Sequence, residues 1–201
     1  MKKVVFVDSQ SQGTFHEIFN LSFLLIMSQS YDQVEYIASP SSIENLKKKI
    51  NDSPDISIKN VDFKSVFVPR GELSYHIFIR KLFGAFTILR CILKYRKREK
   101  IILSSLNEFS TLYLNTVSKF CKVSIQIICH GELEYLLKEQ IPFFKPLRWY
   151  KKMISMFFNH SINENISFLL LGKSIKNNLT QFFPNHQNKF SYINHPYFFQ
   201  K

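Results

Sequence analysis

The sequence predicts an α/β fold, a Rossmann-like open and mostly parallel sheet of about seven strands with helices on both faces. Short apolar runs rich in Val and Ile alternate along the chain with longer segments of helical periodicity. Polar turns separate the two kinds of segment, as in strand–helix–strand units, whose parallel strands need a long connection. No repeat, low-complexity tract or linker interrupts the alternation, so residues 1–201 are expected to form a single domain.

The predicted strands are the short apolar runs. Residues 4–8 read VVFVD, a β-branched run closed by an acid, which is typical of a central strand that is buried on both faces. Six later runs have a similar character. The predicted strands are residues 4–8, 34–38, 56–61, 100–104, 123–129, 166–171 and 189–193.

The predicted helices fill the intervals between the strands. Thr14 and Glu17 have capping-box spacing and open a helix that ends near residue 28. Pro40 suits the first turn of the next helix, which ends near Asn51. The longest helix is predicted from residue 72 to about residue 98, with apolar residues spaced 4-3-4-3 at positions 78, 82, 85, 89 and 92. Further helices are predicted over residues 108–120, after residue 131 as far as Pro142, over 142–158 and over 173–182.

The composition limits the compartment and the partners. The formal net charge of +12, from 27 Lys and Arg against 15 Asp and Glu, favours an anionic partner such as nucleic acid, anionic lipid or a phosphorylated substrate. No apolar run reaches the roughly 18–20 residues needed to cross a bilayer, and Asp8 interrupts the first run at strand length, unlike a signal peptide. Cys91, Cys121 and Cys129 show neither CxxC nor metal-ligand spacing. We therefore expect a cytoplasmic protein with reduced cysteines and no metal site.

The loop after the first predicted strand is a candidate anion site. In an open parallel sheet, ligands bind where loops leave the carboxyl ends of the strands. Gln12, Gly13 and Thr14 are small or polar residues at the opening of a helix, where backbone N–H groups can hold an anion. The dinucleotide fingerprint GxGxxG is absent because Gly13 is the loop's one glycine. A polar turn that caps the helix is the equally weighted alternative.

The loop after the fifth predicted strand is the strongest candidate. His130 directly follows an apolar strand, where an imidazole can orient a sugar hydroxyl or a phosphate. Gly131 lets the backbone approach a ligand closely. Glu132 is a candidate for substrate binding, although carboxylates at 132 and 134 also complement the dipole of the helix that follows. We expect His130 to be functional.

Two further polar residues follow strands four and six. Asn107 is a candidate for substrate binding, but the favoured interpretation is that Ser105 or Asn107 caps the helix beginning near residue 108. Lys173 lies in GKS, which resembles the end of a phosphate loop but lacks the upstream glycine of GxxxxGKS. A tight turn into a helix is favoured there, with a lysine aimed into a cleft as the alternative.

The segment from residue 142 to 158 is both basic and aromatic. At helical spacing Leu147, Tyr150, Ile154 and Phe157 share one face. Its aromatic and basic residues suit the interface of an anionic membrane. The residues expected at that surface are Lys145, Arg148, Trp149, Lys151 and Lys152. An ordinary core-facing helix with a basic outer face is the alternative, and nucleic-acid binding is disfavoured because no RNP, helix-turn-helix or zinc-finger pattern is present.

Four segments, taken in order, resemble the N-terminal domain of a GT-B glycosyltransferase, close to the family-four-like enzymes of bacterial polysaccharide synthesis. They are VVFVD with its polar loop, IQIICHGELEYL, FLLLGKSIKNNL and SYINHPYFF. The resemblance implies an acceptor-binding domain that faces a C-terminal, nucleotide-sugar-binding domain not contained in this chain. It also implies that His130 is the catalytic cleft histidine and that Gly13 belongs to the glycine-bearing first loop, where Gln12 replaces a second glycine. No metal or cofactor bound by this domain is implied.

The expected function follows from this resemblance. We expect the acceptor-binding half of a glycosyltransferase that transfers a sugar from a nucleotide sugar to a glycan or lipid-linked acceptor in surface polysaccharide synthesis. It would act in the cytoplasm, at the inner membrane face, and would be inactive as an isolated domain. The alternatives are a non-catalytic Rossmann-like module that binds polyanions, an anionic membrane or a protein partner, and a membrane-associated scaffold.

Overall fold

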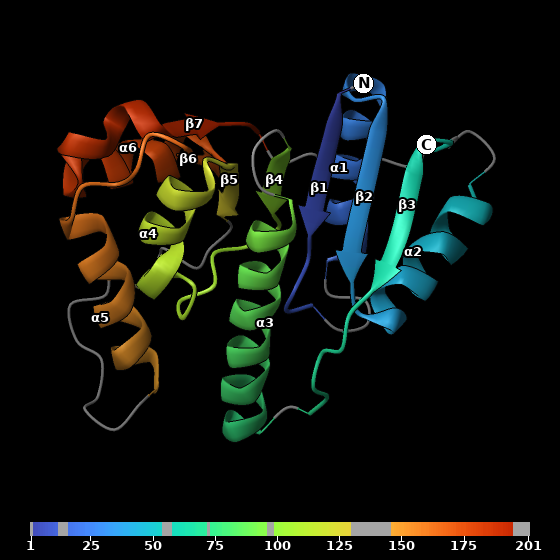
Figure 1. Ribbon diagram of the computed structural model, residues 1–201, viewed down its shortest axis with the longest axis horizontal. Helices are drawn as coiled ribbons and strands as arrows, with labels where there is room; N and C mark the ends of the chain where they lie inside the picture. The colour runs from blue at the N-terminus through green and yellow to red at the C-terminus, as the bar shows by residue number, and fades with distance from the viewer. Residues whose placement is uncertain are drawn as a thin grey trace.

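The computed structural model describes residues 2–11, 16–53, 58–71, 73–95, 99–129 and 146–194. Their strands form one seven-stranded sheet in the order β3-β2-β1-β4-β5-β6-β7, and every neighbouring pair is parallel (Figure 1). This arrangement confirms the predicted Rossmann-like α/β fold. The strands are β1 (Lys3–Val7), β2 (Gln33–Ala38), β3 (Val61–Ser65), β4 (Lys100–Leu103), β5 (Ser124–Cys129), β6 (Ile166–Leu170) and β7 (Phe190–Tyr192).

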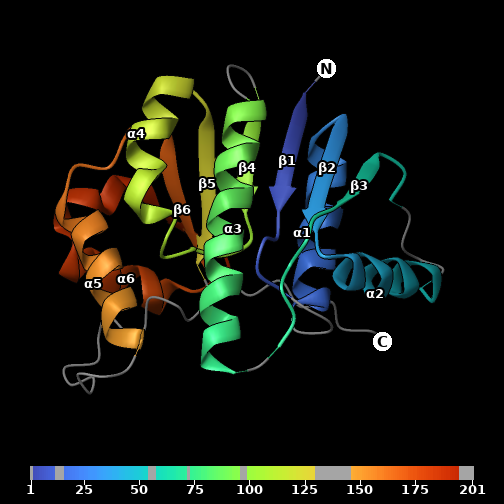
Figure 2. The same cartoon turned by 60° about the horizontal axis from the view of Figure 1, so that its bottom comes forward.

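The helices cover both faces of the sheet. They are α1 (Glu17–Ser30), α2 (Pro40–Asn51), α3 (Ser74–Lys94), α4 (Thr111–Cys121), α5 (Pro146–Asn159), α6 (Lys173–Phe182) and the 3₁₀ helix η2 (Pro184–Lys189). Side chains of α1 and α2 pack on one face, behind the sheet in Figure 1, and those of α3 to α6 pack on the other. Figure 2 shows α3 and α4 crossing in front of the central strands.

The first strand shows how the sequence specifies two hydrophobic cores. Val5 and Val7 belong to the core under α3, whereas Val4 and Phe6 belong to the core under α1. All four side chains are at most 1% exposed. Because successive side chains of a strand point to opposite faces, a strand covered on both faces reads as a continuous apolar run.

The third strand differs from its prediction. The sequence suggested residues 56–61 or a little beyond, but β3 runs from Val61 to Ser65, so the predicted start is wrong. Its sequence VDFKS alternates apolar with charged residues, and none of its side chains is fully buried. β3 lies at the edge of the sheet, where charged side chains are tolerated and protect the free edge from pairing with another chain. An edge strand therefore lacks the continuous apolar run that marks the central strands.

The order of the strands places a topological switch point between β1 and β4. From β1 the chain proceeds outward to β2 and β3, then returns to β4 and proceeds the other way to β7. The chain therefore continues toward opposite sides of the sheet after β1 and after β4. In open α/β sheets this topological switch point is where ligands bind.

Candidate functional site

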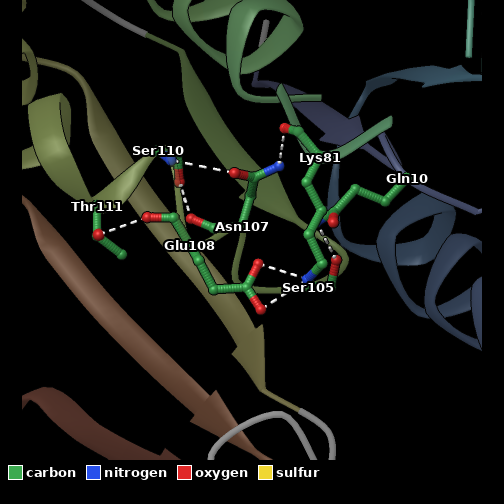
Figure 3. Close-up of polar contacts among 7 residues, drawn as sticks. All are labelled: Gln10, Lys81, Ser105, Asn107, Glu108, Ser110 and Thr111. Atoms are coloured by element: carbon green, nitrogen blue, oxygen red, sulfur yellow. Dashed lines mark hydrogen bonds and ion pairs between the residues drawn. The ribbon is translucent and has the colours of Figure 1, made fainter. Parts of the chain in front are cut away.

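The loops after β1 and β4 meet at the switch point. The Gln10 side-chain amide donates a hydrogen bond to Ser105 Oγ, at 3.2 Å (Figure 3). Both side chains are partly exposed, so each presents polar atoms to solvent. An amide and a hydroxyl can donate and accept hydrogen bonds, which suits the hydroxyl groups of a polar ligand.

A buried carboxylate holds the first of these loops in place. Asp8, at the end of β1, is 0% exposed and accepts hydrogen bonds from Asn20 Nδ2 at 2.6 Å, Ser104 Oγ at 3.1 Å and the Ser11 backbone N–H at 3.2 Å. These donors come from α1, from the segment after β4 and from the loop itself. Burial, and secondarily the charge of Asp8, raise the pKa of the Tyr36 phenol well above its ordinary value. Asp8 is therefore a positioning residue that supports the loop from below.

A buried ion pair lies beside the same loops. Lys81 of α3 donates to both carboxylate oxygens of Glu108, with Nζ 2.6 Å from Oε1 (Figure 3). The side chain of Glu108 is 2% exposed and that of Lys81 is 19% exposed. The Lys81 ammonium also lies 4.7 Å from the centroid of the Tyr150 ring, within cation–π range. The pair joins α3 to the segment before α4 and leaves part of one cation at the surface.

Asn107 is buried between these elements. Its Nδ2 donates to the Lys81 carbonyl at 2.8 Å, and its Oδ1 accepts from the Ser110 backbone N–H at 3.1 Å (Figure 3). Asn107 thus caps the turn that leads into α4, whereas the sequence favoured a cap on a helix beginning near residue 108; α4 begins at Thr111. Its contacts are with the protein, and its side chain is 0% exposed.

Gly84 allows α3 to approach both loops closely. A Cβ at this position would lie 3.0 Å from Asn107 Nδ2, 3.1 Å from Gln10 Cγ and 3.1 Å from the Ser9 carbonyl oxygen. A glycine inside a helix costs about 1 kcal/mol relative to alanine. The close crossing explains why a glycine stands there, since a larger residue would push α3 away from the loops.

Lys173 is not part of this cluster. It is the first residue of α6, is exposed, and follows β6, which lies two strand spacings, roughly 10 Å, from β4. Gly172 before it has φ of 150°, a conformation that favours glycine, and its carbonyl accepts the first helical hydrogen bond from Lys176. The favoured interpretation, a tight turn into a helix, therefore describes this segment.

Helix α5 carries part of the basic surface. Tyr150, Ile154 and Phe157 are buried, as the predicted helical face requires. On its outer side Arg148 and Lys152 are exposed, Lys151 is half-buried and Trp149 is 70% exposed. Helix α5 thus packs three residues of the predicted face against the core and has a basic outer side; the side chain of Leu147 lies outside the described residues, and the membrane contact of the outer side stays a prediction.

Several predicted site residues lie outside the described part of the chain. They are Gln12, Gly13, Thr14, His130, Gly131, Glu132 and Lys145, and their roles stay predictions. Within the described ranges, no group of His, Cys, Asp and Glu is arranged to hold a metal ion. No helix in those ranges is both long enough and apolar enough to span a bilayer.

The structure adds three site residues that the sequence did not single out, Gln10, Lys81 and Glu108, and it places Ser105, predicted only as a possible helix cap, against Gln10. The position of Gln10 and Ser105 could have been predicted from the sequence, because both residues follow predicted central strands. That of Lys81 could not, since its place depends on where α3 crosses the sheet.

Comparison with known proteins identifies the fold. No protein-family model and no curated protein sequence matches this chain. Several solved structures match its backbone, including the two that follow. UGT89C1 of Arabidopsis thaliana, solved with UDP, superposes with a TM-score of 0.60 at 12% sequence identity. The match covers 98% of this chain and 53% of the UGT89C1 chain. A UGT transferase from Siraitia grosvenorii, also with UDP, gives 0.55 at 11% identity, covering 96% and 50%. The chain spans about half the length of these proteins and has the fold of one half of a GT-B glycosyltransferase.

Proposed function

We propose that this chain is the acceptor-binding half of a glycosyltransferase, which transfers a sugar from a nucleotide sugar to a glycan or lipid-linked acceptor in surface polysaccharide synthesis. The observation that carries the proposal is the junction of Gln10 and Ser105 at the switch point of a GT-B-like half. That position combines the fold of a sugar-transferring enzyme with polar groups suited to a polyhydroxylated ligand.

The described residues have distinct roles in this proposal. Gln10 and Ser105 bind acceptor hydroxyl groups, and the partly exposed Lys81 attracts an anionic group on the acceptor. Asp8 and Asn107 position the loops from buried sites. His130 is proposed to act at the reacting hydroxyl, with Gln12, Gly13, Thr14, Gly131 and Glu132 surrounding the same switch point and Lys173 at its rim.

The donor is proposed to bind a second domain. Transfer leaves negative charge on the departing nucleotide phosphates, and an enzyme must supply positive or hydrogen-bonding groups to stabilise it. Those groups are assigned to the second domain, so this chain alone is expected to bind acceptor without transferring sugar. The proposed location is the cytoplasm, peripheral to the membrane.

The test is a titration of the ¹⁵N-labelled chain with a panel of neutral and acidic oligosaccharides and, separately, with UDP-sugars. We expect glycans to shift the side-chain amide signals of Gln10, and UDP-sugars to leave them unchanged. Gln10→Ala combined with Ser105→Ala should weaken glycan binding by about tenfold, from the loss of one or two hydrogen bonds. The matched control is Thr116→Ala in α4, on the side of the sheet where the strands begin. Glycan binding that is unaffected by the double substitution would contradict the proposal.

A second candidate function rests on the charge. A net charge of +12 suits a non-catalytic module that binds polyanions. Such binding would fall steeply with salt and would not depend on Gln10 or Ser105. Titration with heparin and with single-stranded DNA at about 0.05 and 0.2 M salt distinguishes this module from a glycan-binding domain.

A further inference from the structure

The first half of α3 leaves an apolar face uncovered. Large apolar side chains that are 37–71% exposed lie close together in this part of the chain. They are Phe67, Leu73, Tyr75, Phe78, Ile79, Leu82, Phe83 and Phe86. Figure 1 shows the reason, since α3 runs past the carboxyl ends of the strands and has no sheet beneath its first turns.

These side chains form one continuous stripe, here named the outer face of α3. Within the helix they occupy positions 75, 78, 79, 82, 83 and 86, the i, i+3, i+4, i+7, i+8, i+11 series of an amphipathic helix. The residues that α3 buries in the core, Ala85, Ile88 and Ile92, lie beside this stripe, at about 220–280° around the helix from Tyr75. At 100° per residue the exposed series spans about 140° of the helix circumference. The helix therefore has two apolar sides, of which one packs against the core and the other is exposed.

Helix α5 extends this surface and adds positive charge. Phe78 contacts Phe109 with ring centroids 5.2 Å apart, and Phe109 contacts Tyr150 at 6.1 Å. Phe109 therefore connects α3 to α5 near the carboxyl ends of the strands. Trp149, next to Tyr150, is 70% exposed. Neither helix contains Asp or Glu, and of their seven Lys and Arg residues two, Lys81 and Lys94, form ion pairs with Glu108 and Glu35 of other elements.

We propose that the outer face of α3 inserts into the interface of an anionic lipid bilayer, with Arg148, Lys152 and Trp149 of α5 at headgroup depth. An amphipathic helix with aliphatic and aromatic side chains on one face and cations beside it has the chemistry of an interfacial membrane anchor. The absence of acidic residues from both helices favours anionic lipid over a protein partner, whose rim would carry both signs of charge. The inference rests on the proposed function only for its location at a membrane.

The experiment is flotation of the full chain with phosphatidylcholine vesicles that contain about 30% phosphatidylglycerol, compared with vesicles of phosphatidylcholine alone. The single tryptophan, Trp149, reports binding through a blue shift and through quenching by brominated lipid. We expect Tyr75→Ser with Phe86→Ser to lower the partition coefficient at least about tenfold, because both substitutions remove aromatic area that would be buried in the bilayer interface. Phe120→Ser is the matched control. Phe120 is 82% exposed but lies near the end of α4, where the strands begin, away from the outer face of α3.

Each outcome decides the proposal. A loss of binding in the α3 variant, with the Phe120 variant and the far-ultraviolet circular dichroism unchanged, supports it. Equal binding by the α3 variant and the wild type overturns it, as does concentration-dependent dimerisation that the same substitutions abolish, because the outer face would then be an interface between copies. No sugar is present in this assay, so its failure leaves the glycan titration unaffected, and the reverse also holds.

Discussion

The ion pair between Lys81 and Glu108 gives the sharpest test of the site's geometry. Lys81→Met removes the ammonium that donates to both oxygens of the Glu108 carboxylate, which is 2% exposed. Breaking a buried pair in this way costs about 3–5 kcal/mol of unfolding free energy. Glu108→Met should cost less, about 1.5–3 kcal/mol, because the Lys81 ammonium is 19% exposed and can be hydrated. The two costs differ because Glu108 is almost fully buried and Lys81 is partly exposed.

The double variant Lys81→Met/Glu108→Met isolates the interaction free energy of the ion pair from the separate effects of the two substitutions. Replacing both charges with apolar side chains of similar volume removes the unpaired ion, so we expect a stability within about 1 kcal/mol of the wild type. The coupling free energy of the double-mutant cycle should then exceed about 2 kcal/mol. Urea unfolding followed by circular dichroism and by Trp149 fluorescence measures all four proteins.

A surface pair provides the control. Lys64 and Asp62 are 3.5 Å apart, but their side chains are 42% and 50% exposed. Asp62→Asn should therefore change stability by less than about 1 kcal/mol, because water screens exposed pairs. Costs that are equal for Lys81→Met and Asp62→Asn, or a double variant that costs the sum of the two single variants, would refute the reasoning about burial.

Three further predictions concern particular residues. At pH 8 iodoacetamide should label the half-buried Cys121 but not Cys91, because burial raises the pKa of the Cys91 thiol to about 11; comparable rates would contradict this. The raised pKa also means that this thiol's contribution to stability is complete below about pH 9 and is lost as the pH rises through about 11. Gly84→Leu should lower the unfolding free energy by about 1–3 kcal/mol and weaken glycan binding, since α3 must move from the loops; unchanged urea midpoints and affinity would argue against the close crossing. Gly172→Ala should cost about 1–3 kcal/mol because φ is 150°, whereas the neighbouring Ser174→Ala should not.

The central sheet was predictable because its strands are buried on both faces. Strands such as β1 and β4 read as unbroken apolar runs, and the helices between them fix a parallel topology. β3 was misplaced for the opposite reason. An edge strand that is covered on one side alternates apolar with charged residues, and the sequence just before it has a similar composition.

The site was predictable only in part. Topology alone indicated the loops after the strands, and Asn107 was identified in this way, together with its capping alternative. The contact of Lys81 with Glu108 spans 27 residues and depends on the height at which α3 crosses the loops. Gly84 sets that height, yet a single glycine in a helical pattern does not reveal what it packs against. The predicted apolar series of α3 includes Phe78 and Leu82, which are exposed, because periodicity shows that a face is apolar without showing what covers it.

Helix α3 connects the two proposed surfaces. Its inner side presents Lys81 and Gly84 to the loops of the switch point, while its outer face, through Tyr75 and Phe86, is proposed to enter the bilayer. An α-helix has a diameter of about 10–12 Å with its side chains, so the switch point would lie within about one helix diameter of the lipid headgroups. An acceptor with a lipid anchor could then reach Gln10 and Ser105 without leaving the membrane. This geometry favours a lipid-linked acceptor over a free glycan, and we expect vesicle-anchored glycans to bind more tightly than their soluble counterparts, a difference that Tyr75→Ser with Phe86→Ser should abolish.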